Sequence, residues 1–218
     1  MESGTTTRDP GLPRNVEKLS QRERLLWSMV RVIAEKGYDD VTVRDVVARA
    51  GVSRITFSEE FESKDECLFA AYDRVIDELV IYVADAFRSE RDWPERIRDG
   101  LDALLRALAA EPDVAQMAAV EFPAAGPQAH QRYRDALERF LPFLEEGREF
   151  SGHSGELPPG VELMAVGGVE VIIFDEVVGG RVSNLPAMLP EIVFAVLVPF
   201  IGPEDAASAM HAAAEQAG

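Results

Sequence analysis

Residues 42–57 read TVRDVVARAGVSRITF, and the predicted fold depends on this stretch. It begins with Thr42-x-x-Asp45, in which the hydroxyl can accept from the N–H three residues on while the carboxylate accepts from the threonine N–H. Gly51 supplies the positive φ that a tight turn requires, and Ser53 can cap the helix that follows. Two short helices joined by a tight turn are typical of a helix-turn-helix.

Two further helix starts flank this pair. Ser20-x-x-Glu23 and Ser63-x-x-Glu66 repeat the capping pattern, and apolar residues at helical spacing follow each of them. Together the cap signals predict helices over about 21–36, 43–50, 53–60 and 64–87. The third of these helices directly follows the tight turn, which makes it a candidate DNA reader.

The rest of the chain is predicted to be helical as well. Beyond Trp93-Pro94, apolar segments are separated by prolines, and no alternating run lies between hairpin turns. Val169–Phe174 is rich in strand formers, yet apolar residues continue after it without a turn signal, so its context favours a buried helix. The predicted fold class is therefore all-α.

The charge distribution separates two parts of the chain. Its 218 residues carry a net charge of −17, which by itself argues against a nucleic-acid partner. Residues 14–54, however, hold nine Lys and Arg against six Asp and Glu, for +3, so the remainder carries −20. A basic module on an acidic body can approach DNA while the body is held away from it.

The sequence predicts a cytoplasmic protein without a membrane span. The N-terminus lacks a basic stretch followed by an apolar one, so no signal peptide is expected. The longest apolar run, Ile192–Ile201, is shorter than the roughly 20 residues of a membrane helix and contains Pro199. The single cysteine, Cys67, excludes an intrachain disulfide and is expected to fill the core rather than sense redox state.

No pattern of catalytic or metal-binding residues is present. His130, His153 and His211 stand far apart with no cysteine pair beside them. Gly167-Gly168 and Gly179-Gly180 lack the Lys-Ser/Thr of a phosphate loop. We therefore expect a protein that is not an enzyme and that uses no cofactor and no metal.

Residues 20–69 together resemble a known DNA-binding domain. The resemblance is carried by Arg22-Glu-Arg-Leu-Leu, Ala34-Glu-Lys-Gly-Tyr38, Thr42-Val-Arg-Asp-Val-Val-Ala-Arg-Ala-Gly-Val-Ser-Arg54, Thr56-Phe57, Phe61 and Ser63-Lys-Asp-Glu66. The stretch resembles the DNA-binding domain of the tetracycline-repressor (TetR, AcrR-type) family of transcriptional regulators. More loosely, Glu121, Ala125-Gly126-Pro127 and residues 189–203 resemble the regulatory part of some members.

The resemblance implies an all-helical homodimer, usually a repressor that leaves its palindromic DNA operator when a small hydrophobic ligand enters the C-terminal domain. It divides the chain into a flexible N-terminal arm (1–19), a three-helix DNA-binding domain with the helix-turn-helix (20–66), and a helical ligand-binding and dimerisation domain (67–218). The alternative is a helical protein-interaction module with impaired DNA binding.

Residue by residue, the resemblance implies phosphate contacts by Thr42 and Lys64 at two helix starts, with Arg44 beside the first. The recognition helix presents Arg54 to guanine and Ile55 to a thymine methyl group. The complete set of expected DNA-contacting residues is Thr42, Arg44, Ser53, Arg54, Ile55, Thr56, Ser58 and Lys64. Ser53 is expected to act more as a cap than as a base reader.

One departure from the family pattern lies at the end of this reader. Where members commonly have an aromatic residue and then basic or histidine residues, this chain has Ser58-Glu59-Glu60. Two carboxylates there interact unfavourably with the negative end of the helix dipole and with nearby phosphates. Either they turn sideways and pair with Arg49 or Arg54, or DNA contact is weaker or differently placed.

Two sets of residues are expected to form the ligand pocket and the dimer interface. Expected pocket residues are apolar or aromatic, with one carboxylate that would favour a cationic or hydrogen-bond-donating ligand: Trp93, Met117, Glu121, Phe122, Tyr133, Phe140 and Phe174. Expected interface residues come from the two most apolar helices, over 161–178 and 189–201: Val166, Val169, Ile173, Val177, Ile192 and Val196. For both sets the alternative is plain core.

Overall fold

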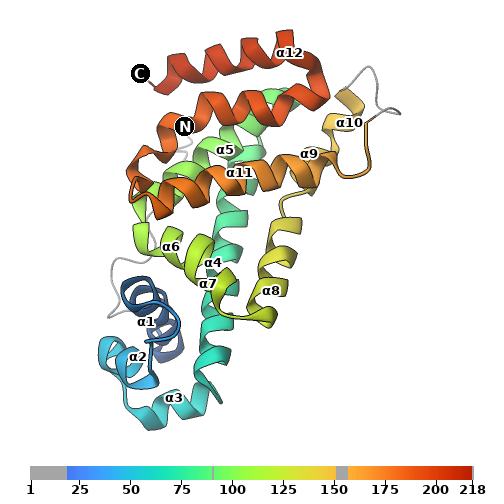
Figure 1. Ribbon diagram of the computed structural model, residues 1–218. Helices are drawn as coiled ribbons and strands as arrows, with labels where there is room; N and C mark the ends of the chain where they lie inside the picture. The colour runs from blue at the N-terminus through green and yellow to red at the C-terminus, as the bar shows by residue number, and fades with distance from the viewer. Residues whose placement is uncertain (1–18, 90, 151–156, 218) are drawn as a thin grey trace, which may run out of the picture.

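The computed structural model describes residues 19–89, 91–150 and 157–217, and every element in these ranges is helical (Figure 1). The N-terminal helices are α1 (Gln21–Lys36), α2 (Val43–Ala50), α3 (Arg54–Glu60) and α4 (Lys64–Phe87). The predicted bounds of these helices agree with the structure to within one residue. The expected arm over residues 1–19 lies almost entirely outside the described residues.

The three helix starts explain why these bounds could be predicted. The Thr42 box is complete: the Asp45 N–H donates to Thr42 Oγ1 at 3.3 Å, and the Thr42 N–H donates to Asp45 Oδ2 at 3.0 Å. Ser20 and Ser63 each accept one such bond, from Glu23 and Glu66. Gly51 ends α2 in the left-handed conformation, with φ 64° and ψ 37°, as the tight turn requires.

The remaining helices build a body on top of α4. They are α5 (Trp93–Ala110), α6 (Pro112–Gln116), the π-helical turn η2 (Met117–Glu121), α7 (Phe122–Ala124), α8 (Pro127–Glu138), α9 (Pro142–Glu145), α10 (Gly147–Phe150), α11 (Val161–Val178), the 3₁₀ helix η3 (Val182–Met188) and α12 (Leu189–Ala217). Figure 1 shows α1–α3 at one end of the molecule, α11 and α12 at the other, and α4 running between them. The ambiguous stretch Val169–Phe174 lies inside α11, so the helical interpretation is confirmed.

The segment Val182–Glu215 is apolar and long enough, by composition alone, to cross a membrane. It does not form one straight helix, because Gly202 interrupts α12 with φ 83° and ψ 168° and Pro203 follows directly. Ile192, Val193 and Leu197 on its first half are fully buried in the body. Its hydrophobicity is therefore explained by the core of the helical body.

Trp93 fixes the far end of the body. Its ring is fully buried, its Nε1–H donates to the Phe143 carbonyl at 3.0 Å, and it meets Phe200 edge-on at 5.2 Å between ring centres. Gly147 packs directly on this pair, so that a Cβ atom added there would overlap both rings. The site joins α5, α10 and α12 through contacts that leave no space for another methyl group.

Gly147→Ala is therefore expected to lower the free energy of unfolding by about 1–3 kcal/mol, as overpacked core substitutions do. The measurement is urea denaturation followed by circular dichroism. Gly160→Ala is the matched control, because no atom lies within 4 Å of a Cβ added at that position. Equal stability of the two variants would contradict this account of the Trp93 site.

Candidate DNA-binding surface and internal cavity

Helix α3 is anchored by its apolar side and presents its polar side to solvent. Phe57 and Phe61 are each 3% exposed, with ring centres 5.7 Å apart, and the Ser53 hydroxyl accepts from the Thr56 N–H at 3.0 Å. Arg54, Ile55 and Ser58 are exposed, and Thr56 is half-buried. Ile55 is 73% exposed, which makes it the most exposed large apolar side chain of the described residues.

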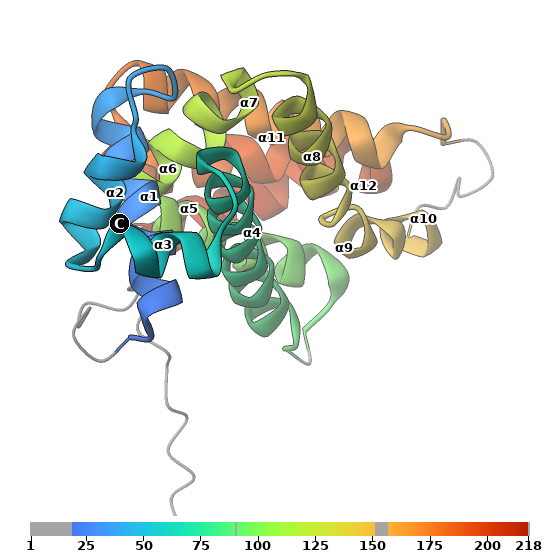
Figure 2. The ribbon, with the colours of Figure 1, turned by 90° about the horizontal axis from the view of Figure 1, so that it is seen from below.

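Figure 2 views the molecule from the end that carries α1–α3. At the start of α2 Thr42 is exposed, but its hydroxyl donates to Asp45 Oδ2 at 2.7 Å. Lys36 donates to the other Asp45 oxygen at 2.7 Å, and this bond, together with those from Thr42, lowers the pKa of Asp45 to about 2. Arg44 is exposed and makes no ion pair with a described residue. Arg44 is thus available to a phosphate group at this end of the molecule.

Lys64 has an intramolecular role that the sequence did not indicate. Its Nζ donates to the Tyr38 carbonyl at 2.9 Å and lies 4.1 Å from the centre of the Tyr38 ring. The Tyr38 hydroxyl in turn donates to Asp65 Oδ1 at 2.9 Å, and burial together with this bond raises the pKa of Tyr38. The loop after α1 is thereby clamped to the first turn of α4.

The two carboxylates at the end of α3 differ in their surroundings. Glu60 lies 3.7 Å from Arg22, whose guanidinium group also stacks 5.0 Å from the centre of the Phe61 ring. Arg49 instead pairs with Glu35 at 2.5 Å, so the predicted pairing with Arg49 or Arg54 was wrong. Sequence spacing could not reveal the Arg22 contact, because it joins residues 38 positions apart in the chain.

Within the described chain, Arg54 and Glu59 form no ion pair. The recognition helix therefore presents one free arginine and one free carboxylate, at opposite ends of its seven residues. Glu60 is compensated by a neighbouring cation, and Glu59 is not.

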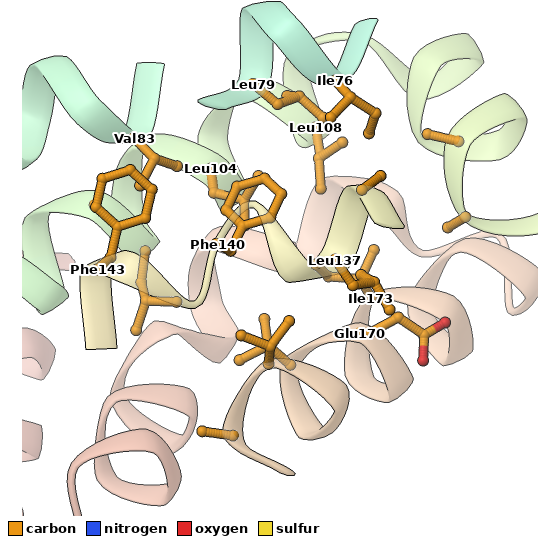
Figure 3. Close-up of a pocket in the computed structure, with 18 of the residues that line it drawn as sticks. Ile76, Leu79, Val83, Leu104, Leu108, Leu137, Phe140, Phe143, Glu170 and Ile173 are labelled. Carbon is orange, nitrogen blue, oxygen red and sulfur yellow. The ribbon is translucent and has the colours of Figure 1, made fainter. Parts of the chain in front are cut away.

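The body encloses an apolar cavity with about 1000 Å³ of empty space, part of it open to solvent. Figure 3 shows its wall, to which α4 contributes Ile76, Leu79 and Val83, and α5 contributes Leu104 and Leu108. Side chains of α8, α11 and the segment around α9 complete it, among them Phe140 and Ile173. Apolar cavities between helices commonly hold small ligands.

Three polar side chains interrupt this apolar wall: Tyr72, Tyr133 and Glu170. Tyr72 stacks on Phe122 with ring centres 3.6 Å apart, and burial raises the pKa of Tyr72. Burial and then the Glu170 carboxylate raise the pKa of Tyr133. The Tyr133 hydroxyl oxygen is enclosed, yet no described residue satisfies the geometry of a hydrogen bond with it.

A family model described as "Bacterial regulatory proteins, tetR family" matches residues 29–71, which run from the middle of α1 into α4. The match identifies the helix-turn-helix region as a TetR-type DNA-binding domain. The fold of the whole chain is that of TetR-family regulators, with an N-terminal helix-turn-helix domain and a C-terminal helical domain.

Among curated proteins, the HTH-type transcriptional activator FasR of Mycolicibacterium smegmatis is 32% identical over 101 residues. That match covers 46% of this chain and 44% of FasR, so it spans less than half the length of the relative. Among solved structures, the fatty acid degradation regulator FadR of Bacillus halodurans matches with a TM-score of 0.75 at 20% identity, over 83% of this chain and 96% of that one. FadR of Bacillus subtilis, solved with stearoyl-CoA, matches with a TM-score of 0.70 at 19% identity, over 81% of this chain and 98% of that one.

Of the seven pocket residues expected from the sequence, Tyr133 and Phe140 line the cavity. Trp93, Met117 and Phe122 are fully buried core residues outside its wall, and Phe174 is 39% exposed on α11. These four residues therefore do not line the cavity. Aromatic and apolar residues fill every interface in this body, so residue type alone did not separate cavity from core.

Glu121 also lies outside the cavity wall. It accepts from Gln116 Nε2 at 3.0 Å, and its Oε2 lies 3.4 Å from the position that a Cβ on Gly37 would occupy. The carboxylate of the cavity is Glu170 instead. Glu121 therefore sits where the body meets the end of α1.

The six expected interface residues face the interior of their own protomer. Val166, Val169, Ile173 and Val196 line the cavity, and Val177 and Ile192 are buried in the core. The apolar side chains of α11 that are exposed form a different stripe: Leu163, Met164, Val171, Phe174 and Val178 are between 39% and 62% exposed.

Two further expectations concern reactive groups. Cys67 is fully buried, and burial raises the pKa of its thiol to about 12, as suits a core residue. In the described ranges no three His, Cys, Asp or Glu side chains gather in a way that could hold a metal ion. His153 lies outside the described residues.

Glu59→Gln is expected to tighten DNA binding by about threefold at low salt, because it removes an uncompensated negative charge from the reading helix. The measurement is fluorescence anisotropy with the DNA upstream of the gene, at several salt concentrations. Glu138→Gln makes the same change in net charge on the exposed face of α8 and is the control. An equal increase in DNA affinity in both variants would mean that affinity depends only on the net charge of the protein.

Proposed function

We propose that this protein is a homodimeric repressor that binds a palindromic operator and is released when a long apolar chain, such as a fatty acyl group, enters the internal cavity. The observation that carries the proposal is the position of α4. Tyr72, Ile76, Leu79 and Val83 on this helix line the cavity, while Cys67 and Leu68 on its first turns are buried against the helix-turn-helix. One helix thus touches both the ligand space and the DNA-reading unit.

The nature of the ligand is supported by the cavity and by the relatives. The wall is almost wholly apolar, and side chains from several helices contribute to it. One similar structure is that of a fatty acid degradation regulator, and another contains stearoyl-CoA. An acyl chain matches this wall better than a polar metabolite does.

Two connections can carry the ligand signal to the DNA-binding domain. The first is α4 itself, whose first turn is clamped to the loop after α1 by Lys64 and Tyr38. The second is η2, whose Ala118 and Ala119 line the cavity while its last residue, Glu121, lies against Gly37. A ligand that favours one arrangement of these elements would change the separation of the two recognition helices in a dimer.

The direction of regulation has a second candidate. FasR is named a transcriptional activator. If this protein also activates transcription, its release from DNA by the ligand would switch a gene off rather than on. In vitro transcription from the upstream promoter, with and without the protein, separates the two: repression lowers transcript yield and activation raises it. The protein-interaction alternative has less support, because Arg44 and Arg54 are exposed and unpaired within the described ranges.

We expect the protein to bind the DNA upstream of its own gene in a salt-sensitive manner and to leave it when a long-chain acyl-CoA is added. Ala165→Phe places a ring in the cavity wall and should abolish the response to the ligand while DNA affinity stays within about twofold. Electrophoretic mobility shifts measure both properties. DNA binding that is unaffected by acyl-CoA in the wild-type protein would contradict the proposed ligand.

The dimer interface is proposed on the exposed stripe of α11 together with the neighbouring face of α12. Met164, Val171 and Val178 recur at intervals of seven residues on one side of α11, and Ala195 and Val198 continue the apolar surface on α12. An exposed apolar surface formed by two packed helices typically marks a protein interface. A two-fold axis through it would place two helix-turn-helix units on the same side.

Val171→Asp is expected to shift the protein from dimer to monomer at micromolar concentration, because it buries an unpaired charge in the interface. Analytical ultracentrifugation checks this. Ile81→Asp introduces the same charge at another exposed apolar residue, 46% exposed on α4, and should leave the dimer intact. A wild-type protein that sediments as a monomer would rule out the interface.

A further inference from the structure

Glu170 and Tyr133 form the polar end of an otherwise apolar cavity. In Figure 3 the Glu170 carboxylate lies at one end of the labelled side chains, and Val83 and Phe143 lie at the other. Tyr133, on α8, contributes an enclosed hydroxyl group whose pKa is raised by burial and by the neighbouring Glu170 carboxylate, and no described residue bonds it with good geometry. A buried hydroxyl whose hydrogen bonding is incomplete can bond with a ligand.

The cavity wall has no cation to receive an anionic head group. None of the described residues that line it is Lys, Arg or His. Of the three arginines next to Tyr133 and Phe140 in the chain, two are engaged elsewhere: Arg132 pairs with Asp73, and Arg139 pairs with Asp77 at 2.8 Å. The third, Arg134, is exposed to solvent. The two ion pairs fasten the α8 region to α4 outside the cavity.

We propose that Glu170 and Tyr133 make the cavity selective for apolar chains that end in a neutral, hydrogen-bonding head group, and that they exclude the free carboxylate of a fatty acid. This inference rests on the proposed function, because it assumes that an apolar chain occupies the cavity. A neutral head can accept from the Tyr133 hydroxyl, and a head that also carries an O–H or N–H can donate to Glu170.

A fatty acid carboxylate at the same position would be repelled instead of bound. It would lie beside a second carboxylate in an apolar space, where like charges repel strongly and neither is well solvated. The Tyr133 hydroxyl alone offers one hydrogen bond against that repulsion. An ester, a thioester or an alcohol of the same chain length carries no such charge.

The test compares a saturated fatty acid with the primary alcohol of equal chain length, both below the concentration at which they aggregate. Binding to the full-length protein is measured by isothermal titration calorimetry. The wild-type protein is expected to bind the alcohol at least about tenfold more tightly than the acid. Glu170→Gln removes the charge without changing the shape and should bring the two affinities to within about twofold.

Two further variants test which residues determine the affinity for the alcohol. Tyr133→Phe is expected to weaken binding of the alcohol by about fivefold, the usual value of one hydrogen bond. Glu138→Gln, on the exposed face of α8, is the control for a changed net charge and should leave both affinities unaltered. Folding of each variant is verified by its unfolding temperature and by its affinity for the upstream DNA.

The outcomes separate this inference from the proposed function. If the wild-type protein binds acid and alcohol equally, the selectivity is overturned while an apolar-chain ligand is still supported. If it prefers the alcohol but Glu170→Gln leaves that preference unchanged, the assignment to Glu170 is overturned. If neither compound binds, the proposed ligand class fails, and the selectivity fails with it.

Discussion

The continuity of α4 is the constraint on which the rest of the structure depends. This helix of 24 residues has no internal proline or glycine, and its first turn is clamped by Lys64 to the Tyr38 carbonyl. Its buried side therefore serves two cores in succession, first that of the helix-turn-helix and then the cavity wall that includes Leu79 and Val83. Because an uninterrupted helix bends little, a displacement of its cavity half would be transmitted to its clamped end.

Several cations of the helix-turn-helix domain are paired with carboxylates of the same chain. Lys36 and Arg49 pair with Asp45 and Glu35, and Arg22 compensates Glu60. Since exposed pairs of this kind contribute little to stability individually, their main effect is to reduce the free positive charge of the surface. In the proposed complex with DNA, affinity would then depend on a few arginines and on helix N-termini, while the acidic body would oppose close approach elsewhere.

The sequence predicted the N-terminal third closely because its signals are local. Each cap joins residues three positions apart, and Gly51 occupies a backbone conformation that other residues rarely adopt. The body lacks such signals. Helix α11 is apolar on nearly all sides, so Ile173 and Phe174 look equally suited to an interface, although one is 8% and the other 39% exposed. Which side faces the cavity is decided by packing against η2, η3, α8 and α12, which periodicity does not encode.

Glu170 and Val171 show what this ambiguity implies for function. The two residues are adjacent in α11, so their side chains point about 100° apart: one lines the cavity and the other is 55% exposed on the proposed dimer face. A ligand in contact with Glu170 would therefore touch the same turn of α11 that is proposed to contact the second subunit. Helix α4 would carry that displacement to the protomer's own recognition helix, and α11 would carry it across the two-fold axis. The spacing of two recognition helices on DNA depends on both movements, which makes the cavity well placed to control it.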